Sequence, residues 1–98
     1  MTKRILIIRP EAQLDLWEAA QWYESHQPGL GEQFTDALGE LIERIAGFPL
    51  QFPELDEGVR RALLHRFPYA VYFVVAEAAI SVIAVLHQRR HPDTWKQR

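Results

Sequence analysis

The side chains best able to do chemistry are histidines and arginines that gather after residue 58. They comprise His65, His87 and His91 together with Arg60, Arg61, Arg66, Arg89 and Arg90. A metal-free ribonuclease needs a base for the 2′-hydroxyl, an acid for the leaving oxygen and cations on the phosphate. The sequence therefore leaves a ribonuclease-like site open. The alternative is that these arginines have no catalytic role and only keep the edge of a sheet hydrated or form ion pairs with acidic helices.

Other catalytic arrangements find little support. His87 and His91 have the spacing of two zinc ligands on a helix, but Pro92 and the preceding strand-like run argue against a helix there. The chain has no cysteine, and its only serines are Ser25 and Ser81, so we expect no Ser or Cys nucleophile with a His–Asp relay. No phosphate-binding loop is present either, and we expect no metal and no cofactor.

The charges are divided unevenly along the chain. Residues 1–57 hold eleven of the thirteen acidic residues but only four of the eleven Lys and Arg residues. The basic remainder is also the strand-like part, so the sequence predicts one basic surface opposite acidic helices. Such a surface suits an acidic protein or a nucleic acid. The net charge of −2 disagrees with an enzyme that grips structured RNA, because binding phosphates requires strong positive charge.

The bulk properties predict one soluble domain over residues 1–98. The absence of cysteine fits a reducing compartment. The longest apolar run, Ala70 to Ala76, is far shorter than a membrane span, and the apolar stretch near the N-terminus is too short for a signal peptide. We therefore expect a cytoplasmic protein with no membrane partner.

Periodicity predicts a strand followed by a helical hairpin. Arg4–Arg9 is short and β-branched, and Pro10 suits the first turn of a helix. Two apolar stripes with helical spacing follow on either side of a Pro28-Gly29 turn: Ala12, Leu16, Ala19 and Tyr23, then Phe34, Leu38, Leu41 and Ile45. Gly39, together with Thr35 and Ala46, is expected to let the two helices approach closely.

The rest of the chain predicts three strands. Phe48–Gly58 is expected to be an irregular connector, and Val59–Arg66, Tyr69–Ala76 and Ile80–Gln88 have strand-like composition. The element order is then β-α-α-β-β-β. The fold class is α+β, with the helical hairpin packed on one face of a mostly antiparallel four-stranded sheet.

The last two strands are apolar on both faces. In the first of them Tyr69, Val71, Phe73 and Val75 alternate with Ala70, Tyr72, Val74 and Ala76, and Ile80–His87 alternates in the same way. One helical hairpin can cover only one face, so the other needs the tail, a second copy or a partner protein. Trp95 is expected to anchor the tail, whereas Trp17 and Trp22 fall beside the core stripe of the first helix.

Several motifs occur in one order along nearly the whole chain. They are Trp22-Tyr23-Glu24, Arg66-Phe67-Pro68-Tyr69 and His87-x-Arg89-Arg90-x-Pro92, together with Ala12…Asp15-Leu16 and Trp95…Arg98. In this order they resemble the toxins of the RelE/ParE superfamily of bacterial type II toxin–antitoxin systems. The resemblance implies the β-α-α-β-β-β architecture. It also implies a cognate antitoxin that is acidic, partly disordered until bound, and encoded in the neighbouring upstream frame.

The resemblance offers two activities. RelE-like members cut mRNA on the ribosome with basic residues on the second, third and fourth strands and a Tyr or His near the C-terminus. Here Arg61 fits one basic position, but Leu63 and Ala70 stand at two others. Gln88 or Arg89 takes the fourth-strand position, and Trp95, the C-terminal aromatic, cannot transfer a proton. ParE-like members lack this set of residues and inhibit DNA gyrase. This sequence matches the ParE-like members better than the RelE-like ones.

We therefore expect a ParE-like, non-nucleolytic toxin that binds DNA gyrase and is neutralised by its antitoxin. The alternatives are a RelE-like ribosome-dependent mRNA endoribonuclease and an inactive member that only binds its antitoxin. For the nuclease, the candidate catalytic residues are Arg61, His87 and Arg89. For binding the target or the antitoxin, the candidates are Arg60, Arg61, Arg66, Tyr69, Tyr72, His87, Arg89, Arg90 and Trp95. We expect no sequence-specific DNA binding without the antitoxin.

Overall fold

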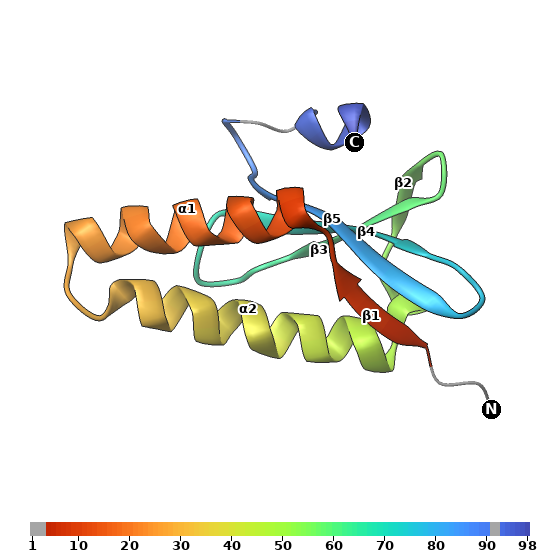
Figure 1. The fold of residues 1–98 in the computed structure, drawn as a ribbon, viewed down its shortest axis with the longest axis horizontal. Coiled ribbons are helices and arrows are strands. Elements are labelled where there is room, and N and C mark those ends of the chain that lie inside the picture. The colour runs from red at the N-terminus through yellow and green to blue at the C-terminus, as the bar shows by residue number, and fades with distance from the viewer. Residues whose placement is uncertain (1–3, 91–92) are drawn as a thin grey trace.

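Two helices in a hairpin lie on one face of a five-stranded sheet (Figure 1). The computed structural model describes residues 4–90 and 93–98. In chain order its elements are β1 (Ile5–Ile8), α1 (Pro10–His26), α2 (Leu30–Gly47), the 3-10 turn η1 (Pro49–Gln51), β2 (Glu54–Asp56), β3 (Val59–Leu63), β4 (Tyr69–Val75), β5 (Ala79–His87) and the 3-10 turn η2 (Thr94–Gln97). The predicted α+β class is confirmed, with one strand more than the expected four.

The additional strand, β2, lies in the connector that was predicted to be irregular. The sheet order is β1-β5-β4-β3-β2, with β1 parallel to β5 and the other pairs antiparallel. The β2–β3 turn consists of Glu57 and Gly58, with φ of 51° and 80°. Positive φ at both central residues marks a type I′ hairpin turn. The sequence concealed it because a glutamate rarely adopts this conformation.

The predicted helical stripes are confirmed. Ala12, Ala19 and Tyr23 of α1 are buried, and so are all four apolar residues of the α2 stripe. The turn between the helices rests on Gly29, at φ 89°, and on the Glu24 carboxylate, which accepts hydrogen bonds of 3.0 Å from the backbone N–H groups of Gly29 and Gly31. The negative charge of this carboxylate also interacts favourably with the positive N-terminal end of the α2 dipole.

The residue that permits close helix approach is Gly31, and the prediction of Gly39 was wrong. A Cβ atom on Gly31 would lie 2.7 Å from the carbonyl oxygen of Ala20, so only glycine fits between the helices. Gly39 is exposed, and a Cβ atom there would meet nothing within 4 Å. In the sequence, either glycine could lie where the two helices approach closely. Only the point at which α1 and α2 cross shows that Gly31 does so.

The sheet has a helix face, which packs under α1 and α2, and a second face on the opposite side. The predicted alternation of β4 is confirmed, with Tyr69, Val71 and Phe73 on the helix face and Ala70 and Tyr72 on the second face. In β5 the predicted alternation is wrong. A bulge opposite Tyr72 and Phe73 inserts one extra residue, Ile83. As a result Val82 and Val85 both face the helices, and Ile83 and Ala84 both face away.

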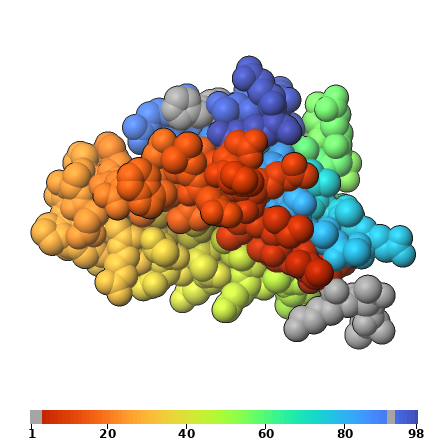
Figure 2. Space-filling view, in the orientation of Figure 1, coloured from red at the N-terminus to blue at the C-terminus, as the bar shows by residue number. Residues whose placement is uncertain are grey.

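The tail covers part of the second face. Trp95 stacks on Tyr72, with ring centroids 5.6 Å apart and an interplanar angle of 16°. Both residues are buried in a second, smaller core with Ala70, Ala84 and Leu86. The predicted anchoring role of Trp95 is thus confirmed, and this part of the sheet needs no partner to cover it. Figure 2 shows the tail packed directly against the first turns of α1.

None of the described helices is long and apolar enough to cross a membrane.

Candidate functional site

The predicted basic surface is divided between the two faces of the sheet. Arg60 pairs across the strands with Phe73 of the helix face, whereas Arg61 pairs with Tyr72 of the second face. Arg60 donates a hydrogen bond of 2.6 Å to the carbonyl oxygen of Phe52 and lies 3.6 Å from a Glu54 carboxylate oxygen. Consecutive residues of a strand point to opposite faces, so these two arginines cannot act on one ligand.

Three other arginines lie at the end of the molecule that carries the helix–helix turn. Arg66 donates a hydrogen bond of 2.7 Å to the side chain of Gln33 at the start of α2. Arg90 lies over the ring of Trp22 near the end of α1, 5.5 Å from the ring centroid. Arg66, Arg89 and Arg90 are all exposed, and we call these three residues the basic end.

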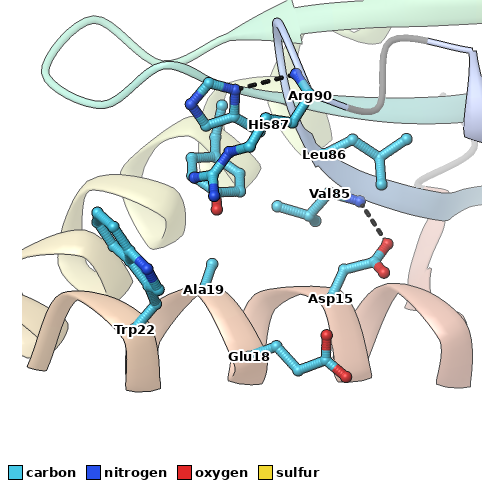
Figure 3. Close-up of a pocket in the computed structure, with 9 residues that line it drawn as sticks. Asp15, Glu18, Ala19, Trp22, Val85, Leu86, His87 and Arg90 are labelled. Atoms are coloured by element: carbon cyan, nitrogen blue, oxygen red, sulfur yellow. Dashed lines mark hydrogen bonds between the residues drawn. The ribbon is translucent and has the colours of Figure 1, made fainter. Parts of the chain in front are cut away.

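A pocket of about 200 Å³ lies between α1 and the last residues of β5 (Figure 3). It brings together three of the predicted site residues, Tyr69, His87 and Arg90, beside Trp22. The rings of Tyr69 and His87 are 5.3 Å apart and nearly perpendicular. The backbone N–H groups of Arg89 and Arg90 donate hydrogen bonds of 3.1 and 3.3 Å to His87 Nδ1. Nδ1 of His87 is therefore a hydrogen-bond acceptor.

Tyr69, which lines this pocket, and its ring neighbour Tyr23 remain neutral hydroxyls at ordinary pH. Burial raises the pKa of Tyr69 above its usual value of 10.0, and the nearby Arg90 only partly opposes this effect. Burial likewise raises the pKa of Tyr23, again with Tyr69 adding to the rise and Arg90 opposing it. A hydroxyl with a raised pKa can donate a hydrogen bond but is a poor base. Tyr69 therefore offers the pocket a hydrogen-bond donor and not a base.

The nuclease candidates are not assembled into one site. Arg61 faces away from the helices, and His87 faces them across from Tyr69, so the sheet separates the two side chains. Leu63 and Ala70, at positions where the nuclease needs cations, are paired cross-strand neighbours. Of the two histidines with zinc-ligand spacing, His87 and His91, the latter lies outside the described residues. Within residues 4–90 and 93–98, no group of three His, Cys, Asp or Glu residues could hold a metal ion.

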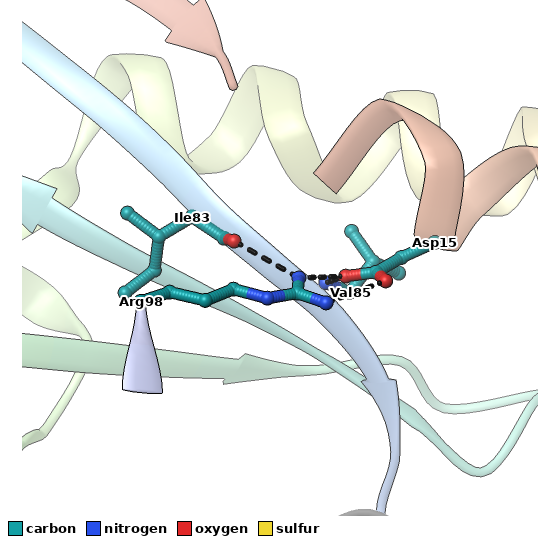
Figure 4. Close-up of polar contacts among 4 residues, drawn as sticks. All are labelled: Asp15, Ile83, Val85 and Arg98. Carbon is teal, nitrogen blue, oxygen red and sulfur yellow. Dashed lines mark hydrogen bonds and ion pairs between the residues drawn. The ribbon is translucent and has the colours of Figure 1, made fainter. Parts of the chain in front are cut away.

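Asp15 and Arg98 form a polar pair joined by several hydrogen bonds (Figure 4), although the sequence had predicted no binding or catalytic role for either residue. Strand β1 pairs with β5 only as far as Ile8 and Val82. Beyond that point Asp15 Oδ2 accepts a hydrogen bond of 3.0 Å from the Val85 N–H, and Arg98 donates one of 3.2 Å to the Ile83 carbonyl.

Arg98 also donates to both carboxylate oxygens of Asp15, and the bond to Oδ1 measures 3.0 Å. This hydrogen bonding to Asp15 raises the pKa of Arg98. The pair thus takes the place of the strand that is missing beside β5, with the carboxylate as acceptor and the guanidinium as donor. Neither residue alone signals this role. Asp15 and Arg98 lie in different motifs of the resemblance, at opposite ends of the chain.

Comparison with known proteins agrees with this fold. A family model described as "ParE toxin of type II toxin-antitoxin system, parDE" matches residues 6–92. The chain belongs to the ParE toxin family. A solved structure titled "Chromosomal ParDE TA system from P. aeruginosa" has the same fold, with a TM-score of 0.66 and 21% sequence identity. The match covers 87% of this chain and 96% of that one. No curated protein matched the chain.

The family assignment confirms the predicted RelE/ParE resemblance and places the chain on its ParE side. The chain is therefore the toxin of a type II toxin–antitoxin system, in which the partner is an antitoxin.

Proposed function

We propose that this ParE-family toxin acts by binding DNA gyrase and not by cutting RNA, and that a cognate antitoxin neutralises it. The observation that carries the proposal is the separation of Arg61 from His87 by the sheet. A phosphodiester-cleaving site must place a base, an acid and cations around one phosphate. Two groups on opposite faces of a sheet cannot do so without a change of fold.

The surroundings of the two residues support the same conclusion. Leu63 and Ala70 form an apolar pair close to Arg61, so neither of them supplies the second cation that a nuclease would need beside it. On the other face, His87 accepts backbone hydrogen bonds at Nδ1, and its neighbour Tyr69 is held neutral by burial, which raises its pKa. Tyr69 thus offers a hydrogen-bond donor to a binding partner and is a poor base for phosphoryl transfer.

We further propose that the basic end contacts the target. Arg66, Arg89 and Arg90 are exposed, and two of them lie close to aromatic rings, with Arg66 over Phe67 at 5.5 Å and Arg90 over Trp22 at 5.5 Å. Arginines beside aromatic rings are common at the centre of protein interfaces. Positive charge also accelerates association with an acidic protein surface.

The test is a pair of assays on the purified toxin. DNA supercoiling by purified gyrase should be inhibited, and mRNA on translating ribosomes should remain intact. Changing Arg66, Arg89 and Arg90 together to Glu should weaken gyrase inhibition at least tenfold. Arg9→Glu, at the N-cap of α1 and therefore at the opposite end of that helix from the basic end, should change it less than twofold.

The outcome that refutes the proposal is mRNA cleavage that disappears when Arg61→Ala and His87→Ala are combined. If the toxin neither inhibits gyrase nor cuts mRNA but still binds the antitoxin, the protein is instead an inactive antitoxin-binding member.

A further inference from the structure

The pocket between α1 and the last residues of β5 adjoins the basic end, because Arg90 belongs to both (Figure 3). Its volume of about 200 Å³ is smaller than the roughly 300–1,000 Å³ that small-molecule ligands occupy. A pocket of this size instead fits a single side chain of a protein partner. Pockets that receive one side chain are common anchor points at the centre of protein interfaces.

Tyr69 supplies this pocket with a hydrogen-bond donor. The residue is only 8% exposed, yet no group within residues 4–90 and 93–98 forms a hydrogen bond with its hydroxyl. Burial raises the pKa of this hydroxyl, so the group stays protonated. A buried donor without an internal acceptor is best satisfied by a partner that brings an acceptor into the pocket.

The charges around this hydroxyl favour a negatively charged acceptor. Of the two charges that shift the pKa of Tyr69, that of Arg90 has the larger effect and that of Asp15 the smaller. The Asp15 carboxylate is already paired with Arg98. Arg90 lies over the ring of Trp22 and is exposed, so its N–H groups are accessible to a ligand. An acceptor that meets both a hydroxyl and a guanidinium is bound most strongly when it is a carboxylate.

We infer that this pocket receives an Asp or Glu side chain of gyrase, whose carboxylate accepts hydrogen bonds from the Tyr69 hydroxyl and the Arg90 guanidinium. The inference rests on the proposed inhibition of gyrase and names one contact of that interface. A DNA phosphate has similar chemistry, but the net charge of −2 and the division of Arg60 and Arg61 between two faces favour a protein partner.

The test measures inhibition of DNA supercoiling and affinity for gyrase, with and without DNA. Tyr69→Phe removes only the hydroxyl and should weaken both at least tenfold, because a hydrogen bond to a charged group is lost. Tyr23→Phe is the matched control. Tyr23 is also 8% exposed but does not line the pocket, so its change should have less than a twofold effect. Thermal unfolding should confirm that both variants are folded.

Glu18→Gln tests the sign of the charge that the pocket receives. Glu18 is exposed and lines the pocket, so its carboxylate repels an anionic side chain and attracts a cationic one. At low salt, removal of this charge should strengthen inhibition at least twofold. Unchanged or weaker inhibition would show that the occupant is neutral or cationic, and it would overturn the inference.

Two other results would also overturn the inference. The first is a Tyr69→Phe variant that inhibits gyrase as strongly as the wild type. The second is a Tyr69→Phe defect that occurs only when gyrase holds DNA, which would assign the pocket to a DNA phosphate. A wild-type toxin that does not inhibit gyrase would instead refute the proposed function itself.

Discussion

Replacing Arg98 by alanine should destabilise the fold by about 2–3 kcal/mol. The change removes the hydrogen bonds of Arg98 to Asp15 and its bond to the Ile83 carbonyl. All of these bonds involve the charged guanidinium, and a hydrogen bond to a charged group contributes about 1.5–3 kcal/mol. The bonds share one guanidinium and the side chains of Arg98 and Asp15 are 21% and 13% exposed, so we count the group as one such interaction, at about 2–3 kcal/mol, and do not add its bonds.

The assay is urea unfolding followed by circular dichroism, with thermal unfolding as a second measurement. For a domain of this size the loss corresponds to a decrease in Tm of roughly 10–20 °C. Lys96→Ala is the control, because the ion pair of Lys96 with Asp93 is exposed and should contribute less than about 0.5 kcal/mol. The amide of Val85 should also exchange faster in an Asp15→Ala variant, since its acceptor is lost.

A double-mutant cycle tests whether the two side chains act together. In an Asp15→Asn background, Arg98→Ala should cost about 1–2 kcal/mol less than it does in the wild type. If the two effects are additive within about 0.5 kcal/mol, the pair is not coupled and our account of the β5 edge is wrong.

Three further predictions follow from the packing. Gly31→Ala should destabilise by about 1–3 kcal/mol, because its Cβ atom would clash with the Ala20 carbonyl. Gly39→Ala should instead stabilise by about 0.5–1 kcal/mol, and equal effects in urea unfolding would contradict this. Trp95→Ala should cost about 3–5 kcal/mol, whereas Trp17→Ala, at a position 59% exposed, should cost less than about 0.5 kcal/mol by the same measurement. Because Tyr23 and Tyr69 have raised pKa values, stability should hold below about pH 10 and fall as the pH rises through their folded values. Combining Tyr23→Phe with Tyr69→Phe should flatten this alkaline decrease, and an unchanged slope would show that other groups cause it.

Much of the fold could be predicted from the sequence because its signals are local. The stripe from Phe34 to Ile45 and the alternation from Tyr69 to Val75 each lie within one element, and both are confirmed. The tail anchor Trp95 was also predicted correctly. A large aromatic residue after a proline has few ways to be buried other than by folding back onto the domain.

The errors lie where two elements meet. The bulge in β5 depends on how β5 pairs with β4, and it changes the face on which every later residue of the strand lies, His87 included. Gly31 and Gly39 have equivalent sequence signals, and only the crossing of α1 and α2 makes one of them indispensable.

The sequence by itself determined the helices, the strands other than β2 and the two apolar faces of β4, because each depends on residue type and short-range spacing. The order of its motifs also carried the family resemblance. The tertiary structure decided which cations share a surface. Arg60 and Arg61 are neighbours in the chain but lie on opposite faces, whereas Arg9 and Lys96, at opposite ends of it, line one groove. It also joined Asp15 to Arg98 at the open edge of β5. Contacts of this range depend on strand order and register, which short-range spacing does not contain.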